Sequence, residues 1–477
     1  MLSHSLLLAD KEVYKLKKVT RCISLVVFFA MIFTSAQATT LFSYFVSCSF
    51  YEGYQTFAQA HPDVSVQTCS QYYETTSTFA NALNLGELTC DLFGLDTLSY
   101  DWSSLMEKGY CADLSDSTII SNIMSQLYPN IAALGMKDGH IYAVPTRITF
   151  RNILFNQDAL AMCGLEDEPT PQSFPELLDF ADRWCDLIEE NGAYEGLRLH
   201  AGWVPDLYGE GTYSAWLISL LIDSYISQTQ YAGETLDFNN QELIGLLEQC
   251  MTVGRRLYAL EPKPRNTDSG VGIGFLETAP QLLWPTNADQ IVCFRLNDQQ
   301  PAILKAVVDM QAVYSGSGQT ELAVQFLESL LVGEENPANF QRQLLYTNAE
   351  PKISNNYEHT IATDKKYITE TEAQLQNSKL STDERIALED ELAKWKQELI
   401  DDESDERKYL VSAAKLASYR EKEPYFYFET PNAFNSSTEA SSQLQSLEEQ
   451  YANGVINVET LVKELNRIAR MSMLEDE

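Results

Sequence analysis

The sequence predicts an α/β protein made of two lobes, each a mainly parallel sheet flanked by helices. The chain has 477 residues, of which 45% are hydrophobic, so it is long enough to bury more than one core. Its first part alternates strands and helices over six predicted elements, at residues 41–46, 50–60, 64–66, 78–84, 88–95 and 102–108. This alternation is typical of a parallel sheet that helices cover on both faces.

The rest of the chain continues the pattern with longer helices. A glycine turn at 138–139 leads into one strand, and a second strand at 148–156 is placed to cross between the lobes. The other predicted elements are helices at 172–191, 214–227, 240–258 and 320–331, a strand at 290–296, and two final helices at 437–453 and 458–471.

The segment from about 357 to 423 is densely charged. Ser381 and Glu384 form a capping box, and residues 388, 392, 395 and 399 are apolar at helical spacing. We expect a helical hairpin, inserted as a solvated arm packed on the second lobe. A docking surface for a partner is the alternative.

The first 38 residues read as a secretory signal peptide. Basic residues between Lys11 and Arg21 precede an apolar run at 23–33, and Ala36-Gln37-Ala38 forms a cleavage site. The apolar run is too short to span a bilayer, so we expect a secreted or cell-surface protein that begins near Thr39. A lipid-anchoring cysteine is not evident at the expected place, which leaves attachment to the cell open.

Composition and motifs argue against several classes of protein. A net charge of −35 repels nucleic acid and anionic lipid. The eight cysteines after the signal peptide contain no CxxC pair and the five histidines are dispersed, so we expect no metal site and no cofactor. An even number of cysteines in an exported chain allows disulfides, and buried free thiols are the alternative. No catalytic motif is present, although two carboxylates would suffice for an exported glycosidase.

Several phrases resemble the family 1 extracellular solute-binding proteins of bacterial ABC transporters, the group that includes maltose-binding protein. They are 57–66, 85–93, 108–114, 139–145 and 155–158, in the family's order. The resemblance implies the type II periplasmic-binding-protein-like fold, with a helical insertion and crossovers near 144–147 and 293–297. The implied division is a signal peptide at 1–38, a first lobe at 39–146 and 293–345, and a second lobe at 147–292 and 346–477, the last part containing the charged insertion at about 357–423.

The resemblance also implies a function. The chain would be the extracellular component of an ABC importer, a monomer that captures a sugar or oligosaccharide between its lobes and delivers it to the permease subunits. The alternatives are a surface adhesin or sensor with the same fold, a binding protein for polyamines or peptides, and, least favoured, the exported glycosidase.

Sugar sites combine aromatic platforms with planar hydrogen-bonding groups. The loop at 203–213 offers Trp203, Asp206 and Tyr208 where the second lobe should face the ligand. Trp284 lies near a position where the family often places a tryptophan against its ligand. The alternative is that these aromatic rings only close the surface of their lobe or pack in its core.

Three further candidates belong to strand ends and to the last crossover. Asp96 follows the strand at 88–95, and Arg147 follows the strand that enters the second lobe. Ligands of open α/β sheets are commonly contacted at such positions. The alternative for both is a salt bridge. Tyr427, in the aromatic run before the final helices, is a weaker candidate.

Overall fold

The computed structural model describes most of the chain after residue 38. The described residues are 39–44, 51–69, 71–150, 154–155, 165, 167–191, 210–260, 290–291, 293–333, 342–378 and 380–475. The predicted signal peptide lies outside them. Among the helices of these ranges, none combines the length and hydropathy needed to cross a membrane.

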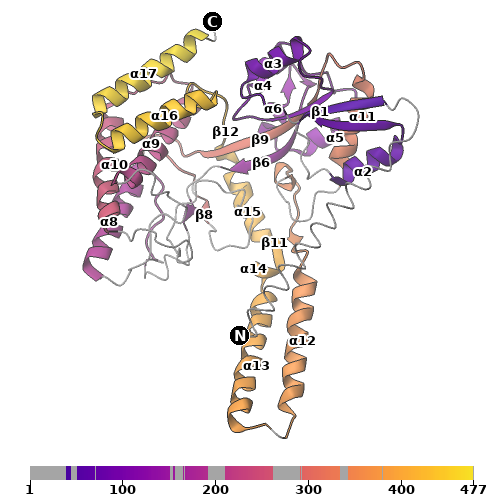
Figure 1. The fold of residues 1–477 in the computed structure, drawn as a ribbon, viewed down its shortest axis with the longest axis vertical. Coiled ribbons are helices and arrows are strands. Elements are labelled where there is room, and N and C mark those ends of the chain that lie inside the picture. Colours follow the sequence, from indigo (N-terminus) through magenta and orange to yellow (C-terminus); the bar gives the residue numbers. More distant parts are fainter. Residues whose placement is uncertain are drawn as a thin grey trace.

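A six-stranded sheet forms the centre of the first lobe (Figure 1). Its strands are β1 (Thr39–Tyr44), β2 (Val64–Cys69), β3 (Leu92–Asp96), β6 (Val144–Phe150), β9 (Leu304–Val313) and β12 (Phe426–Phe428). The pairs β1–β2, β1–β3 and β9–β12 are parallel, whereas β3 and β6 run antiparallel to β9. The α/β class is therefore confirmed. The sheet is mixed because β9, a strand that the sequence did not predict, returns against the direction of the first three.

Helices cover this sheet as the early alternation predicts. They are α2 (Tyr51–Ala60), α3 (Thr76–Asn84), α4 (Trp102–Glu107), α5 (Thr118–Gln126), α6 (Pro129–Leu134) and α11 (Thr320–Val332), with a small hairpin of β4 (Met136–Lys137) and β5 (His140–Ile141). Their buried side chains and those of the sheet form one continuous core. Phe93 of β3 shows how it packs, since its ring stacks on Trp102 and meets Phe79 edge-on.

The second lobe is mainly helical in the part of the chain that the structure describes. It contains α8 (Phe174–Asn191), α9 (Thr212–Tyr231), α10 (Gln241–Leu260), α16 (Thr438–Ala452) and α17 (Val458–Glu475), with the short antiparallel pair β7 (Leu154–Phe155) and β8 (Gln290–Ile291). Trp184, Leu217, Leu247 and Leu461 lie in its separate core. Figure 1 shows this bundle beside the first lobe.

Within the described residues, the chain passes between the two cores three times. The first passage runs from Phe150 in the first core to Phe174 in the second. The second passage returns from Leu296 in the second core to Leu304 in the first, and the third runs from Phe426 in the first core to Phe434 in the second. Crossovers were predicted near 144–147 and 293–297. The first lies later than predicted because Ile148 and Phe150 are buried in the first core.

The charged insertion belongs to the first lobe, which corrects the prediction that it packs on the second. It comprises α12 (Tyr357–Leu375), α13 (Thr382–Asp402), α14 (Asp405–Lys408) and α15 (Ala413–Lys422), and β10 (Lys352–Ile353) pairs with β11 (Tyr409–Val411) at its base. Val411, Leu416 and Tyr419 lie in the first core, so residues 346–426 do not complete the second lobe as predicted. The short helices η3 (Gln343–Leu345) and η4 (Glu423–Tyr425) flank this region.

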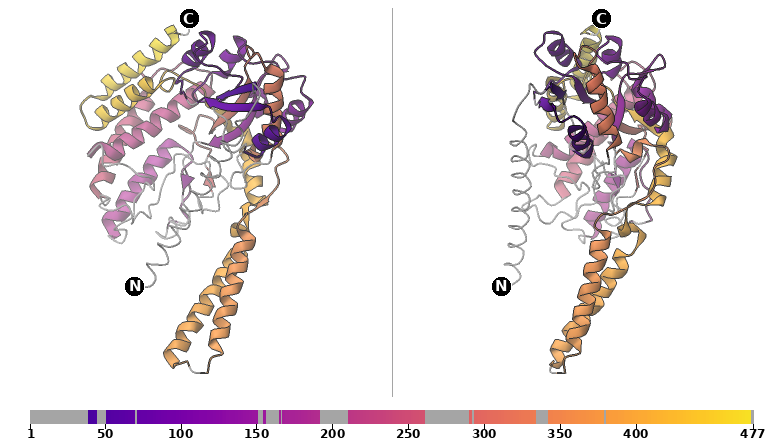
Figure 2. Two further views of the ribbon diagram at one scale, coloured as in Figure 1. Left: turned by 45° about the vertical axis from the view of Figure 1, so that its right-hand side comes forward. Right: turned by 90° about the vertical axis from the view of Figure 1, so that its right-hand side faces the viewer.

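The predicted helical hairpin is confirmed by α12 and α13, which project away from both lobes (Figures 1 and 2). Tyr367 and Trp395 stack across it with ring centroids 4.5 Å apart, and Lys396 pairs with Glu372 at 2.8 Å. The α13 side chains are all at least partly exposed. The hairpin is therefore held by a narrow seam and by ion pairs.

No disulfide joins two of the described cysteines. They are Cys69, Cys90, Cys111, Cys185, Cys250 and Cys293, whereas Cys48 and Cys163 lie outside the described residues. Burial raises the pKa of Cys111 to about 12 and that of Cys293 to about 11. These thiols pack as small apolar groups and are poor nucleophiles at neutral pH.

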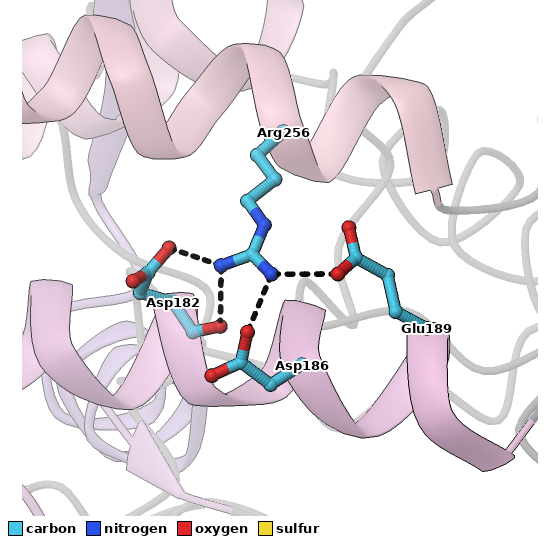
Figure 3. Close-up of polar contacts among 4 residues, drawn as sticks. All are labelled: Asp182, Asp186, Glu189 and Arg256. Atoms are coloured by element: carbon cyan, nitrogen blue, oxygen red, sulfur yellow. Dashed lines mark hydrogen bonds and ion pairs between the residues drawn. The ribbon is translucent and has the colours of Figure 1, made fainter.

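Arg256 joins α10 to α8 in the second lobe (Figure 3). Its Nη1 donates to Asp182 at 2.7 Å, and its Nη2 donates to Asp186 at 2.5 Å and to Glu189 at 2.9 Å. These hydrogen bonds raise the pKa of the guanidinium, Asp186 contributing most. The three carboxylates lie on one face of α8, so a single cation neutralises part of their mutual repulsion.

We expect Arg256→Ala to lower the free energy of unfolding by about 1 kcal/mol, because all three carboxylates are about half exposed and solvent screens the pairs. Urea unfolding at low and high salt measures the effect, which should shrink as salt rises. Arg183→Ala is the control, since Arg183 on α8 forms an ion pair with a single carboxylate, Glu168, in the part of the chain that the structure describes. Equal losses for both variants at low salt would contradict the prediction.

Candidate functional site

One face of the first-lobe sheet is left partly open where β3, β6 and β12 meet β9. In the register of the strands, Asp309 of β9 lies opposite Arg147 of β6 on one edge and opposite Asp96 of β3 on the other. Lys305 of β9 lies opposite Tyr427 of β12. Because side chains alternate along a strand, residues paired in this way share a face. We call this surface the open face; it comprises Asp96, Arg147, Thr149, Lys305, Val307, Asp309 and Tyr427, and all of them are at least partly exposed.

The residues between them point to the opposite face and are buried. The core on that side contains Ile148, Phe150, Leu304, Ala306 and Val308. The ring centroids of Phe150 and Phe426 lie 5.1 Å apart. β6 pairs with β9 at both Ala306 and Asp309, so it occupies one whole edge of β9 there. β12 also pairs at Ala306 and β3 also pairs at Asp309, so these two strands lie end to end along the opposite edge. This register brings the end of β12 toward the end of β3.

A charged group stands at the β3 end of the open face. Arg147 Nε lies 2.7 Å from Asp309 Oδ2, and the Arg147 side chain is 44% exposed. Burial raises the pKa of Asp309 and nearby Asp96 raises it further, while Arg147 acts in the opposite direction. Asp96 accepts a hydrogen bond from the Ser99 amide at 2.7 Å through Oδ1. Arg147 is thus held at one nitrogen and turned partly to solvent.

The other end of the open face contacts α9 of the second lobe. Lys305 forms an ion pair with Asp223, and the Tyr427 hydroxyl donates to Gln230 Oε1 at 3.0 Å. Tyr231 meets the Tyr427 ring edge-on with centroids 5.9 Å apart, and burial raises the pKa of Tyr427 well above its usual value. Because α9 belongs to the second core, the open face is turned toward the second lobe beside the crossovers.

The structure brings three of the seven predicted site residues together. Asp96 and Arg147 lie at one end of the open face and Tyr427 at the other. The salt bridge foreseen as the alternative for Arg147 is present, to Asp309. Trp203, Asp206, Tyr208 and Trp284 lie outside the described residues, so their role remains a prediction.

The sequence analysis missed the contribution of β9 and α9. Lys305, Asp309 and Gln311 lie on one face of β9, whose opposite face is wholly apolar, and this pattern does signal one polar face. Asp223, Gln230 and Tyr231 line one side of α9, a helix that is otherwise mostly buried. These residues are polar or charged, which suits hydroxyl-rich ligands. Within the described residues no group of three or more His, Cys, Asp or Glu side chains is placed to hold a metal ion.

Comparisons with known proteins identify the fold. No protein-family model and no curated protein matches the chain. Among solved structures, a chitin oligosaccharide binding protein matches with a TM-score of 0.50 and 10% identity over 92% of this chain and 99% of that one. A substrate-binding protein from Listeria monocytogenes in complex with cycloalternan matches with a TM-score of 0.48 and 15% identity, over 91% and 98%.

A cyclic maltosyl-maltose binding protein from Arthrobacter globiformis has a TM-score of 0.48 and 13% identity over the same shares of the two chains. The first of the three similarities confirms the predicted two-lobed, type II periplasmic-binding-protein-like fold. At these identities the comparison establishes the fold alone.

Proposed function

We propose that the protein is the extracellular solute-binding component of an ABC importer and that it captures a sugar or oligosaccharide between its lobes. The observation that carries this proposal is the fold: two separate cores, three crossovers, and a partly exposed polar face of one lobe turned toward the other. Two bodies joined in this way close around a ligand by hinge motion, and the ligand stabilises the closed state.

The open face has the groups that such a ligand requires. Arg147 offers planar donors, Asp96 and Asp309 offer acceptors, and the Tyr427 ring lies at the far end. Lys305 and Asp309 are four residues apart on one strand, a span of about 13 Å. This length suits a ligand of two or more sugar rings better than a single ring.

We further propose that the chain is exported by its signal peptide, works as a monomer and passes its ligand to permease subunits without altering it. The open face contains two neighbouring carboxylates, Asp96 and Asp309, as a glycosidase would need, but the Asp309 carboxylate forms an ion pair with Arg147. Incubating the purified protein with sugar polymers and following release of reducing ends tests this point. Turnover would favour the glycosidase alternative instead.

The proposal is tested with the protein from Thr39 onward by thermal shift and calorimetry against mono- and oligosaccharides, peptides and polyamines. A ligand at a hundredfold excess over its Kd should add about 2.7 kcal/mol to the apparent stability. We expect a shift with one class of sugar, together with a smaller radius of gyration in small-angle scattering. A shift with peptides alone would overturn the sugar assignment, and binding without compaction would argue against an importer component.

We expect Arg147→Ala to weaken binding of that sugar about 100-fold, because it removes the most exposed donor of the open face and leaves Asp309 without its partner. Calorimetry measures the loss. Arg183→Ala, on the second-lobe helix α8, is the matched control and should bind as the unmodified protein does. An Arg147→Ala protein with unchanged affinity would remove this face from the site.

A further inference from the structure

The seam of the charged hairpin follows a heptad pattern. Its positions are alternately four and three residues apart, and each is at least partly buried; they are 357, 361, 364, 368, 371 and 375 on α12 and 388, 392, 395, 399 and 402 on α13. Most of these positions hold apolar or aromatic residues, but one on each helix holds an aspartate. Asp364 and Asp402 thus occupy seam positions where the pattern favours an apolar side chain.

The Asp364 carboxyl is buried against another carboxyl. Asp364 is 5% exposed, and its Oδ2 has no hydrogen-bond partner among the described residues. The carboxyl of Asp402, whose side chain is 17% exposed, lies within hydrogen-bond reach of it. Ionised carboxylates only accept hydrogen bonds, so the two groups can bond to each other only when one of them holds a proton. Without that proton, a buried acceptor is left unpaired beside a like charge, which is costly.

The charges around Asp364 and Asp402 favour the proton. Glu398 of α13 adds a third carboxylate, and Arg407 of α14 places its Nη1 2.7 Å from Asp402 Oδ1. Burial raises the pKa of Asp364, Asp402 and Glu398 raise it further, and Arg407 acts in the opposite direction. Three carboxylates therefore meet this guanidinium, and a proton on Asp364 lowers the excess of negative charge.

The two aspartates lie where the hairpin joins the first lobe. Asp402 ends α13, and Arg407 belongs to α14, which leads into β11. β11 pairs with β10, and its Val411 is buried in the first core. The exposed side chain of Lys365 on α12 pairs with Glu403 at 3.1 Å at this junction. Both helices extend from the junction away from the lobes (Figure 2), so the protonation state of Asp364 bears on how firmly they are held.

We propose that a proton shared between Asp364 and Asp402 closes the base of the hairpin, so that the hairpin is held firmly on the first lobe in acidic medium and loosens when the proton is lost. Because the pKa of Asp364 in the folded protein lies above its ordinary value of about 3.9, this stabilisation is complete below the ordinary value. It is lost as the pH rises through the raised value. The inference does not depend on the ligand or on the proposed function.

Hydrogen exchange on the protein from Thr39 onward tests the inference. Peptides covering 357–368 and 395–408 are followed at about pH 4.5 and about pH 8, on either side of the expected loss, and each rate is corrected for exchange in an unfolded chain at the same pH. We expect the equilibrium constant for opening of these peptides to rise at least about fivefold between the two pH values. Peptides of α11 in the first core should change less.

Two variants with the same change of charge separate the buried pair from the general charge of the hairpin. Asp364→Asn carries an amide that donates to Asp402 at every pH, as the protonated carboxyl does, so the base should stay as protected at the higher pH as at the lower one. Asp390→Asn alters an exposed position of α13 and should keep the full pH response. A thermal midpoint within a few degrees of the unmodified protein confirms that each variant is folded.

Each outcome supports or overturns the inference. Equal protection of the unmodified base at both pH values overturns it, as does a pH response that survives Asp364→Asn. Loss of the response in Asp390→Asn also overturns it, because the general charge of the hairpin would then be the cause. Sugar binding and compaction are measured separately, so a failure here leaves the proposed function standing.

Discussion

Replacing Gly254 by alanine is expected to lower the free energy of unfolding by about 2 to 3 kcal/mol. Gly254 lies where α10 crosses α9, and a Cβ atom added there would stand 2.4 Å from the Ser214 amide nitrogen and 2.5 Å from its Cα. Ser214 is fully buried, and these atoms belong to the backbone of a packed helix, so they cannot move aside as a flexible side chain would. Urea unfolding measures the change.

The same helix supplies the control. Gly245 on α10 has no atom within 4 Å of an added Cβ, and alanine favours the helix over glycine by about 1 kcal/mol. Gly245→Ala should therefore stabilise the protein by up to that amount, while the identical change at Gly254 destabilises it. The same sign at both positions would show that α9 and α10 do not approach as closely as described.

The sequence was sufficient to predict the fold class because each early element carries a local signal. The strand at 41–46 and the helix at 50–60 correspond to β1 and α2, and the apolar spacing at 388, 392, 395 and 399 predicted the hairpin helix α13. These features depend on neighbours one to four positions away, which a sequence shows directly.

The lobe boundaries depend on contacts between distant residues and could not be predicted in the same way. Ile148 and Phe150 would suit a strand of either lobe. Their pairing with β9 and the contact of Phe150 with Phe426 assign them to the first core. Leu416 and Tyr419 of the charged insertion pack on that core too, although their own segment is mostly polar. The polar composition of the segment predicted exposure to solvent, so it did not indicate that these two side chains hold the segment on the first core.

In the candidate site, too, the sequence revealed local features but not contacts between distant residues. The positions of Asp96 and Arg147 near strand ends made them candidates, but their joint role depends on Asp309, more than 150 residues away from Arg147 in sequence. Asp309 was overlooked because β9 itself was not predicted, so its alternation of apolar and charged residues was not considered. Pairing across strands is not visible in one sequence without homologues.

The second large effect is expected at the contact between the lobes. Asp223 of α9 pairs with Lys305 of β9, whose side chain is 15% exposed. Asp223→Ala leaves the lysine ammonium largely buried without its partner, which should cost about 2 to 3 kcal/mol. We place the value below that of a fully buried pair because the Asp223 side chain is 28% exposed. Urea unfolding, read at both lobes if they unfold separately, measures it.

A double variant separates the loss of the ion pair from the unpaired charge. Lys305→Met keeps most of the side-chain volume without the charge, so Asp223→Ala combined with Lys305→Met should recover most of the stability that Asp223→Ala loses. The Tyr427–Gln230 hydrogen bond remains in every variant and still links β12 to α9. The contact should therefore loosen without separating the lobes, and small-angle scattering should show a wider spread of lobe arrangements for Asp223→Ala alone. If the double variant is as unstable as Asp223→Ala, then the burial of Lys305 is not the cause of the loss.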